Sequence, residues 1–579
     1  MTLCVPRAGA RATAPVAAGV AARLLGLVGD PATATVRWDI DWQGPLRVPL
    51  TDEHAVQAAC GIMHVHGRAA GAPAPLAVDY ASTVAGVLAA QGVCAALLAR
   101  AGGADVTRVR TSVGQAALLA LAQYLAAATA DGDAPEDCPP SPADAGDELV
   151  AAACPFVSAD GVRFEIEALD AGRWLDFWRL LGADRAATGR GWRSFQQRFA
   201  TATCALPPAL PAIARRTPFT TIRSAADRSG AAVLAVREDP LPPTVTPPWT
   251  LTPFPEPGGP TIDRARTATA PLAGLRVVES ARRVQGPLAG HVLRLLGADV
   301  VRIEPPGGDP MRGIPPMAGT TSARFSALNA GKAVTEIDFT TDAGRRAVRD
   351  LVSEADVFLH NWAPGKAARL GLDAEDLRAA RPGLVYAWAS GWGDALGPEP
   401  PVGTDYLVQA HSGLAAAVRP ADEPPAPSLM TLTDVLGGLV CAQGVLTALV
   451  ARLRTGRGGR VDSSLYSAAA LVPRGAGRPP ATGRPLRTRD GYIALEPRAR
   501  ERPELLTRAL GLGASASAET IASRARTRPT THWLPGLAAV GVVATPVCTR
   551  LADLARDPRF APALTVGEYA APVAPWEFS

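Results

Sequence analysis

A long apolar segment within residues 425–466 limits what this chain can fold into. From residue 435 to residue 453 nearly every side chain is apolar or small, which predicts a helix that is buried on all sides. Asp434 stands at its start, where a carboxylate is expected to cap the first backbone amides. Residues 454–459 combine glycines with arginines, and this pattern is expected to end the helix.

The same segment occurs a second time, earlier in the chain. The tetrapeptide Ala-Gln-Gly-Val stands at residues 90–93 and again at residues 442–445, an offset of 443 − 91 = 352. At that offset Asp434 falls on Ser82, so one copy starts its helix with a carboxylate and the other with a hydroxyl. The chain therefore contains an internal duplication, and the apolar surface of each helix needs cover.

The segment between the copies, residues 271–403, has the pattern of an α/β domain and no counterpart upstream. A loop at 282–287 and a helix at 291–296 are expected after its first strand. The turn after that strand does not read G-x-G-x-x-G, so a dinucleotide fingerprint is absent. Apolar runs alternating with helical segments predict a parallel, Rossmann-like sheet. Its strands are expected at 275–279, 299–303, 333–338, 357–359 and 384–389.

Composition shifts divide the chain into five expected parts. A small α+β unit at 148–236, with a hairpin at 158–161, closes the first copy. The proline-rich residues 238–270 disfavour helix and strand interiors. The parts are an N-terminal segment with one helix at 14–27 (1–38), a degenerate partial copy (39–237), a linker (238–270), a Rossmann-like large domain (271–470) and a smaller α+β domain (471–579).

Charge and cysteine content exclude several classes of function. Lysine plus arginine exceed aspartate plus glutamate by 58 − 54 = 4, evenly spread along the chain, which argues against nucleic-acid binding. The 8 cysteines form no CxxC pair and no histidine stands at zinc-ligand spacing, so neither a disulfide framework nor a metal site is expected. Apolar stretches are broken by glycines or charges before about 18 residues, and we expect a cytoplasmic protein without a membrane partner.

A series of motifs in residues 271–579 carries a family resemblance. They are PLAGLRVVE, GPLAG, LGADVVRIEPPGGDPMR, LNAGKAVTEIDF, ADVFLHNWAPG, SGWG, VGTDYLVQAHSG, LTDVLGGL and RTGRGGRVDSSL. In this order and spacing they resemble the class III CoA-transferases, which include formyl-CoA transferase, carnitine CoA-transferase and α-methylacyl-CoA racemase. Residues 52–251 resemble the later part of the same family. The resemblance implies a Rossmann-like large domain, a smaller α+β domain, interlocked dimers, and no metal or permanently bound cofactor.

The resemblance also implies a site. Asp434 takes the place of the nucleophile that attacks an acyl-CoA thioester and becomes an aspartyl-CoA thioester, which an acceptor carboxylic acid resolves. Thr404 and Asp405 are expected in the wall of this site. The positions that match the family's CoA contacts are Arg283, Val284, Gln285, Gly286, Asn361, Trp362 and Arg369.

Two alternatives to CoA transfer follow from the same residues. A racemase needs a base on each side of a carbon atom, but Thr404 stands where the racemase branch has histidine, which disfavours that activity. A non-catalytic CoA-binding scaffold is the second alternative, because Ser82 shows that one copy has lost the nucleophile. For the partial copy we expect no chemistry. It is expected to take the packing role of a second subunit, in a monomeric pseudo-dimer or a homodimer, and to be a candidate wall of the Asp434 site.

Overall fold

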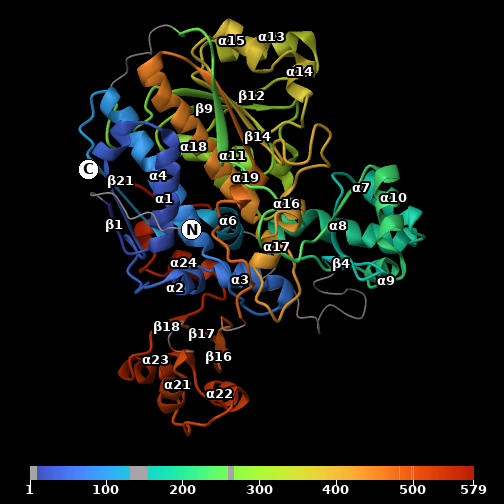
Figure 1. Ribbon diagram of the computed structural model, residues 1–579, viewed down its shortest axis with the longest axis vertical. Coiled ribbons are helices and arrows are strands. Elements are labelled where there is room, and N and C mark those ends of the chain that lie inside the picture. The colour runs from blue at the N-terminus through green and yellow to red at the C-terminus, as the bar shows by residue number, and fades with distance from the viewer. Residues whose placement is uncertain (1–9, 131–153, 259–265, 481–482, 497–498, 500) are drawn as a thin grey trace.

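The computed structural model describes residues 10–130, 154–258, 266–480, 483–496, 499 and 501–579 (Figure 1). Its largest element is a sheet of seven strands, of which six are parallel and one edge strand is antiparallel. This sheet confirms the expected α/β class. In spatial order the strands are β12 (Ala333–Glu336), β9 (Asp299–Glu304), β8 (Arg276–Ser280), β13 (Val357–His360), β14 (Val385–Ser390), β15 (Gly459–Ser464) and β7 (Trp249–Pro253).

Helices follow these strands as expected, with one difference near the first turn. The segment expected as a loop up to residue 287 already belongs to α11 (Gln285–Leu295). The expected helix start at residue 291 is therefore wrong, because proline at the start of a helix lacks only an amide that would be unpaired anyway. The other helices of this layer are α12 (Ala323–Asn329), α13 (Asp342–Ser353), α14 (Lys366–Leu370), α15 (Ala374–Ala380), α16 (Asp405–His411) and α17 (Leu414–Ala417).

The two predicted apolar helices are present and lie against each other at the centre of the molecule (Figure 1). They are α4 (Tyr80–Ala101) and α18 (Leu432–Thr455), and α18 ends at Gly456 with a φ of 66°. By length and composition both helices resemble membrane spans, but 100% and 89% of their most apolar windows are buried inside the protein. Their apolar surface therefore forms a shared core.

The expected capping role of Asp434 is wrong. Helix α18 begins at Leu432, so Asp434 lies inside its first turn rather than before it. The backbone amides of Thr433 and Asp434 donate instead to Oδ1 of Asp405, at 2.6 and 3.0 Å. The Asp405 carboxylate, 29 residues before Asp434, thus replaces the local cap. The Asp434 side chain takes no part in capping.

The first copy also contains part of a parallel sheet, which the sequence did not reveal. Strand β1 (Ala10–Ala12) pairs in parallel with β2 (Arg37–Asp41), which pairs in parallel with β3 (Arg108–Ser112). Helix α1 (Pro15–Val28) connects β1 to β2 and confirms the helix expected at 14–27. The expectation that nothing upstream corresponds to the α/β segment is therefore wrong for β1 and β2.

Each copy contributes an edge strand to the sheet of the other copy. Strand β7 from the first copy pairs antiparallel with β15, and β21 (Glu577–Phe578) from the second copy pairs antiparallel with β3. Strand β7 lies in the segment expected to be a linker without strands. That expectation fails because proline is tolerated on an edge strand.

Two small α+β units project from this core (Figure 1). The first contains β4 (Phe156–Val157), β5 (Arg163–Glu167), β6 (Ala232–Ala235), α7 (Ala171–Leu180), α8 (Arg185–Thr201), α9 (Ala209–Arg216) and α10 (Phe219–Ser229). The second contains β16 (Leu486–Arg487), β17 (Tyr492–Leu495), β18 (Ala544–Pro546), α21 (Pro503–Ala509), α22 (Ala518–Ala525) and α23 (Thr530–Ala539). The strands pair antiparallel within each unit.

Each small unit packs against the short helix that precedes the central helix of the other copy. The amide of Arg237 in the first unit donates to the Ala410 carbonyl at 3.0 Å, and the amide of Cys548, just past β18, donates to the Ala58 carbonyl at 2.9 Å. The two acceptors are again 410 − 58 = 352 residues apart, in α16 and in α2 (Glu53–Ala59). The molecule is therefore a pseudo-dimer within one chain, and the first small unit lies beside the start of α18.

Candidate active site

A pocket lies at the start of α18, where three distant parts of the chain meet. The turn before α11 supplies Arg283 and Val284, and the second copy supplies the residues around Asp434. The remaining wall comes from β5 and α8 of the first small unit. The lining residues are Glu167, Ala168, Leu169, Gln196, Arg198, Phe199, Arg283, Val284, Thr404, Asp405, Tyr406, Thr431 and Asp434.

Two carboxylates in this pocket have different environments. Asp405 is buried and accepts hydrogen bonds from the Gln409 amide at 2.5 Å, from the Thr433 hydroxyl at 2.7 Å and from two backbone amides. The side chain of Asp434 accepts no hydrogen bond within the described part of the chain. Asp405 is therefore held in place as a structural acceptor, while the described residues leave the Asp434 carboxylate without a hydrogen bond.

The environment of Asp434 controls its charge. Burial raises the pKa of its carboxyl well above the usual range, the charge of Asp405 raises it further, and Arg283 opposes the rise. Burial also raises the pKa of Asp405, but the hydrogen bonds from Thr433, Asp434 and Gln409 lower it. Hydrogen bonds to the carboxylate thus favour the charged form of Asp405, whereas Asp434 has no such bonds and burial favours its neutral form.

The first copy repeats this geometry with Ser82 in place of Asp434. Glu53 stands at the position of Asp405 and accepts the backbone amides of Ala81 and Ser82 at 2.9 and 2.8 Å. The Ser82 hydroxyl donates to the same carboxylate at 2.6 Å, and Ser82 is buried. The Ser82 hydroxyl thus helps to hold the start of α4 against Glu53, and the absence of chemistry in the first copy stays a prediction.

Close packing places the turn before α11 beside Asp434. The Gln285 side-chain amide donates to the Ser390 carbonyl at 3.1 Å, and a Cβ added at Gly438 in α18 would lie 2.6 Å from the Gln285 carbonyl oxygen. The side chain of Asn361 accepts the Arg282 amide at 3.0 Å and donates to its carbonyl at 2.8 Å. Gln285 and Asn361, two of the predicted CoA contacts, thus hold the turn.

Backbone strain is concentrated at this pocket. Arg283 and Thr431 have positive φ angles of 64° and 47°, and in the described residues the third such non-glycine position is Ala202, just past α8. Positive φ is unfavourable for a β-branched residue such as Thr431. Strain of this kind persists where the surrounding structure enforces it, and it gathers at functional sites.

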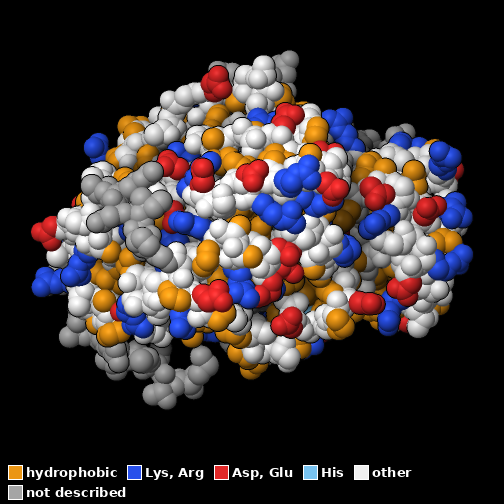
Figure 2. All heavy atoms as spheres, turned by 90° about the horizontal axis from the view of Figure 1, so that it is seen from above, with side chains coloured by type: hydrophobic (Ala, Val, Ile, Leu, Met, Phe, Trp, Pro, Cys, Tyr) orange, Lys and Arg blue, Asp and Glu red, His pale blue; other side chains and the backbone are white. Residues whose placement is uncertain are grey.

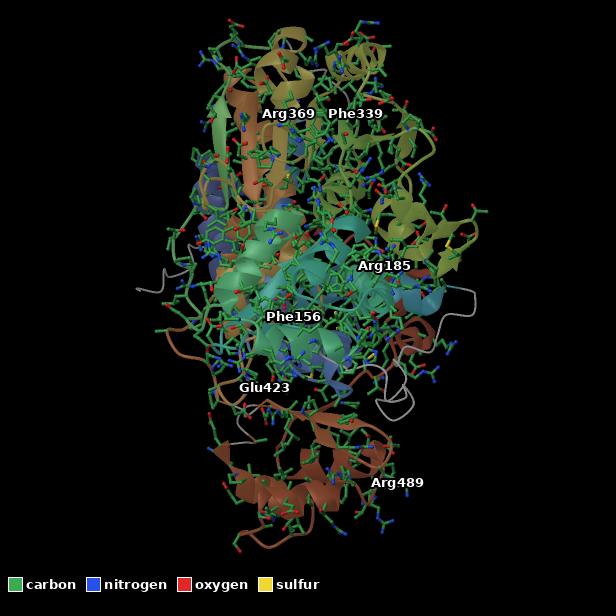
Figure 3. The ribbon with its side chains drawn as sticks, turned by 90° about the vertical axis from the view of Figure 1, so that its right-hand side faces the viewer. Phe156, Arg185, Phe339, Arg369, Glu423 and Arg489 are labelled. Carbon is green, nitrogen blue, oxygen red and sulfur yellow. The ribbon has the colours of Figure 1, made fainter. Side chains whose placement is uncertain are left out.

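The remaining predicted CoA contacts lie outside the pocket. Trp362 is 8% exposed and packs among aromatic rings, 4.7 Å from His360 and 5.2 Å from Phe339 between ring centroids. Arg369 is exposed on α14, at the same end of the large domain as Phe339 (Figure 3). Gly286 packs under the loop, where an added Cβ would lie 2.4 Å from Cβ of Ala281.

Three cations gather at that end of the domain. Burial lowers the pKa of Lys366, and the positive charges of Arg282 and Arg369 lower it further, so both arginines disfavour the charged form of Lys366. No carboxylate pairs with any of them among the residues the structure describes. Figure 2 looks onto this end of the molecule and shows Lys and Arg side chains amid acidic ones. Such a cluster favours binding of an anion such as phosphate.

Sequence reasoning missed the individual residues of the far wall. Arg198 is 2% exposed and pairs with Glu167 at 3.1 Å, while its guanidinium lies 4.6 Å from the centroid of the Tyr406 ring. These residues come from the partial copy, more than 200 positions before Asp434. Neither a motif nor a periodicity connects them with the site, so only the tertiary structure finds them.

The fold and the pocket define a duplicated α/β protein with a free carboxylate in a cleft between a Rossmann-like sheet and a small α+β unit. A sequence model of CoA-transferase family III matches residues 43–239 and 272–577, the two copies in turn. Because these matches cover most of the chain, the protein belongs to CoA-transferase family III.

Individual relatives match a part of this chain. The succinate–glutarate CoA-transferase of Agrobacterium fabrum is 34% identical over 35% of this chain and 52% of its own length. The acetyl-CoA:oxalate CoA-transferase of Acetobacter aceti is 36% identical over 34% of this chain and 51% of its own length. The chain thus spans about half the length of the curated relatives it matches. A solved CAIB/BAIF family protein from Brucella suis is 29% identical, with a TM-score of 0.47 over 53% of this chain and 92% of that chain.

Proposed function

We propose that this protein transfers CoA from an acyl-CoA to a carboxylic acid, with Asp434 as the nucleophile. The observation that carries the proposal is the Asp434 carboxylate, which accepts no hydrogen bond from the described residues although it lines a largely closed pocket. Its neighbour Asp405 orients the start of α18 and leaves the Asp434 oxygens exposed to the pocket. Membership of CoA-transferase family III supports the same reaction class.

The reaction divides one exchange into steps at a single carboxylate. An oxygen of Asp434 bonds to the thioester carbonyl carbon, the C–S bond breaks, and CoA leaves as a thiolate. The product of these steps is a mixed anhydride between the donor acyl group and Asp434. The thiolate then attacks the aspartyl carbonyl carbon of this anhydride, which releases the donor acid and leaves an aspartyl-CoA thioester. The acceptor carboxylate then attacks the aspartyl-CoA thioester, and CoA leaves again as a thiolate. The thiolate attacks the acceptor carbonyl carbon of the resulting anhydride, which forms the new acyl-CoA and restores free Asp434.

The nucleotide end of CoA is assigned to the cation cluster of Arg282, Lys366 and Arg369. The repulsion between Lys366 and the two arginines is relieved when phosphate groups bind between them. The turn at residues 283–286 connects this cluster to Asp434, so a CoA chain lying along it reaches the pocket with its sulfur. The roles of Trp362 and Asn361 are to shape this path.

A small carboxylic acid is the proposed acceptor. The names of the two relatives described above mention succinate, glutarate and oxalate, all of them short dicarboxylates. The pocket wall of this chain contains two arginines, Arg198 and Arg283, which offset the charges of Glu167 and of an incoming carboxylate. Mass spectrometry after incubation with a panel of acyl-CoA thioesters and free acids identifies the pair.

The nucleophile is tested by trapping. Incubation with acyl-CoA followed by peptide mass analysis is expected to place a CoA adduct on Asp434. Asp434→Asn keeps the shape of the side chain but removes the nucleophile, so exchange is expected to fall at least about 1,000-fold. Thermal melting checks that the variant is folded.

The matched control is Ser82→Ala, the same position in the first copy. It is expected to leave exchange unchanged, because Ser82 is buried away from the pocket and bound to Glu53. Near-wild-type exchange by Asp434→Asn would refute the mechanism. Exchange of an α-hydrogen with solvent without acid exchange would indicate a racemase, and CoA binding without turnover would indicate a scaffold.

A further inference from the structure

The hydroxyl of Thr404 is a polar group of the pocket that the steps above do not use. Thr404 lines the pocket with Asp434. Its Oγ1 is buried and has no hydrogen-bond partner within the part of the chain that the structure describes. A buried hydroxyl without a partner destabilises the folded state, so its presence calls for a physical reason.

Thr404 occupies a position where its side chain would ordinarily stabilise a helix. It is the N-cap of α16 and has the extended backbone that capping requires, with φ −121° and ψ 164°. Its side chain nevertheless makes no capping hydrogen bond. The Thr404 hydroxyl therefore does not cap α16, although Thr404 lines the pocket.

The first copy shows that a cap is possible at this position. At the offset of 352, Thr404 corresponds to Asp52 (404 − 52 = 352), the N-cap of α2. The Asp52 side chain accepts the backbone amide of Ala55 at 2.8 Å. The copy without a nucleophile therefore uses this residue as a cap, and the copy with Asp434 leaves it free.

We propose that Thr404 is a catalytic residue whose hydroxyl donates a hydrogen bond to the oxygen of the acyl carbonyl that reacts at Asp434. The inference rests on the proposed CoA transfer. As the Asp434 oxygen bonds to the carbonyl carbon, the π electron pair moves onto the carbonyl oxygen, and the hydroxyl donates to that negative charge while keeping its own proton. When the pair returns, the C–S bond breaks and CoA leaves with its electrons as a thiolate.

Thr404 is held in the right place for this role. Thr404 directly precedes Asp405 in the chain, and the Asp405 carboxylate accepts a hydrogen bond from the backbone amide of Asp434 at 3.0 Å. Asp405 therefore connects the Thr404 hydroxyl to the nucleophile. A donor that is fixed before reaction stabilises the developing charge without reorganisation. Thr431 and Arg283, which line the same pocket, have a strained backbone that the surrounding structure must hold in place.

The test compares Thr404→Val with Thr404→Ser. Valine has nearly the same shape without the hydroxyl, so kcat and the rate of adduct formation on Asp434 are expected to fall about 100-fold, with little change in KM. Serine retains the hydroxyl and is expected to restore most of the rate. The melting temperature of Thr404→Val is expected to equal or exceed that of the wild type, because an unpartnered hydroxyl is removed.

Thr111→Val is the matched control. Oγ1 of Thr111 in β3 is also buried without a hydrogen-bond partner in the described residues, but Thr111 lies outside the pocket. This variant is expected to keep both stability and exchange. An unchanged rate in Thr404→Val, or a lowered melting temperature that accompanies the loss of rate and is not reversed by serine, would overturn the inference. A wild-type protein without any exchange activity would overturn the proposed function instead.

Discussion

Charged residues in the pocket shift the pKa of the Asp434 carboxyl. Three carboxylates, Asp434, Asp405 and Glu167, share the space with Arg283 and Arg198. Arg283 favours the ionised form of Asp434, whereas Glu167 and Asp405 disfavour it. Since only the carboxylate attacks a thioester, activity is expected to fall as the pH drops through the pKa of Asp434.

The pH profile of kcat at saturating acyl-CoA tests this balance. Arg283→Gln removes a positive charge, raises the pKa of Asp434 and is expected to move the acid limb to higher pH. Glu167→Gln removes a negative charge and is expected to move the same limb to lower pH. Shifts of both variants in the same direction would contradict the assignment of this limb to Asp434.

At the scale of elements, small residues set how closely the two copies pack. A Cβ added at Gly444 in α18 would lie 2.6 Å from Cγ1 of Val461 in β15 and 3.3 Å from Cγ of Trp249 in β7. The equivalent Gly92 in α4 meets Val109 at 2.5 Å and Trp576 at 2.9 Å. Each central helix therefore needs glycine where the exchanged strand crosses it.

Gly444→Ala is expected to destabilise the protein by about 1–3 kcal/mol, because an extra methyl group overpacks the contact. Gly19→Ala in α1 is the matched control, since an added Cβ there meets no atom within 4 Å. Alanine at that position is expected to stabilise the helix by about 0.5–1 kcal/mol. Denaturant unfolding of both variants measures the difference, and equal effects of the two would refute the packing argument.

The sequence predicted the elements whose signals are local. Helix α18 was visible in a continuous apolar run, and its end in Gly456. The capping role given to Asp434 failed because capping preferences do not register an acceptor such as Asp405, 29 residues away. The sequence predicted that the partial copy could form a wall of the site, but it did not point to Arg198 or Glu167, because only the fold brings these residues to the pocket.

At the scale of the whole molecule, the duplication lets each copy cover apolar surface of the other within one chain. The apolar faces of α4 and α18 cover each other, and each small unit covers the opposite copy. Just one of the two equivalent positions, Asp434, carries a carboxylate. The arrangement predicts one active site for each chain.

We therefore expect a monomer in solution. Light scattering coupled to size exclusion is expected to give a mass near 59.7 kDa, and twice that mass at micromolar concentration would contradict the internal pseudo-dimer. A fragment of residues 263–579 lacks α4, β7 and the wall with Arg198. It is expected to aggregate or to be inactive, because the surface of α18 loses its cover.

The exchange of β7 and β21 also orders events during synthesis. Strand β3 leaves the ribosome more than 450 residues before its neighbour β21, whereas β7 is made before β15. The sheet of the second copy is therefore completed by a strand that has already been made, while the sheet of the first copy keeps an unpaired edge until β21 has been made. Since exposed edges recruit other strands, the nascent first copy is the part of this protein most in need of a chaperone.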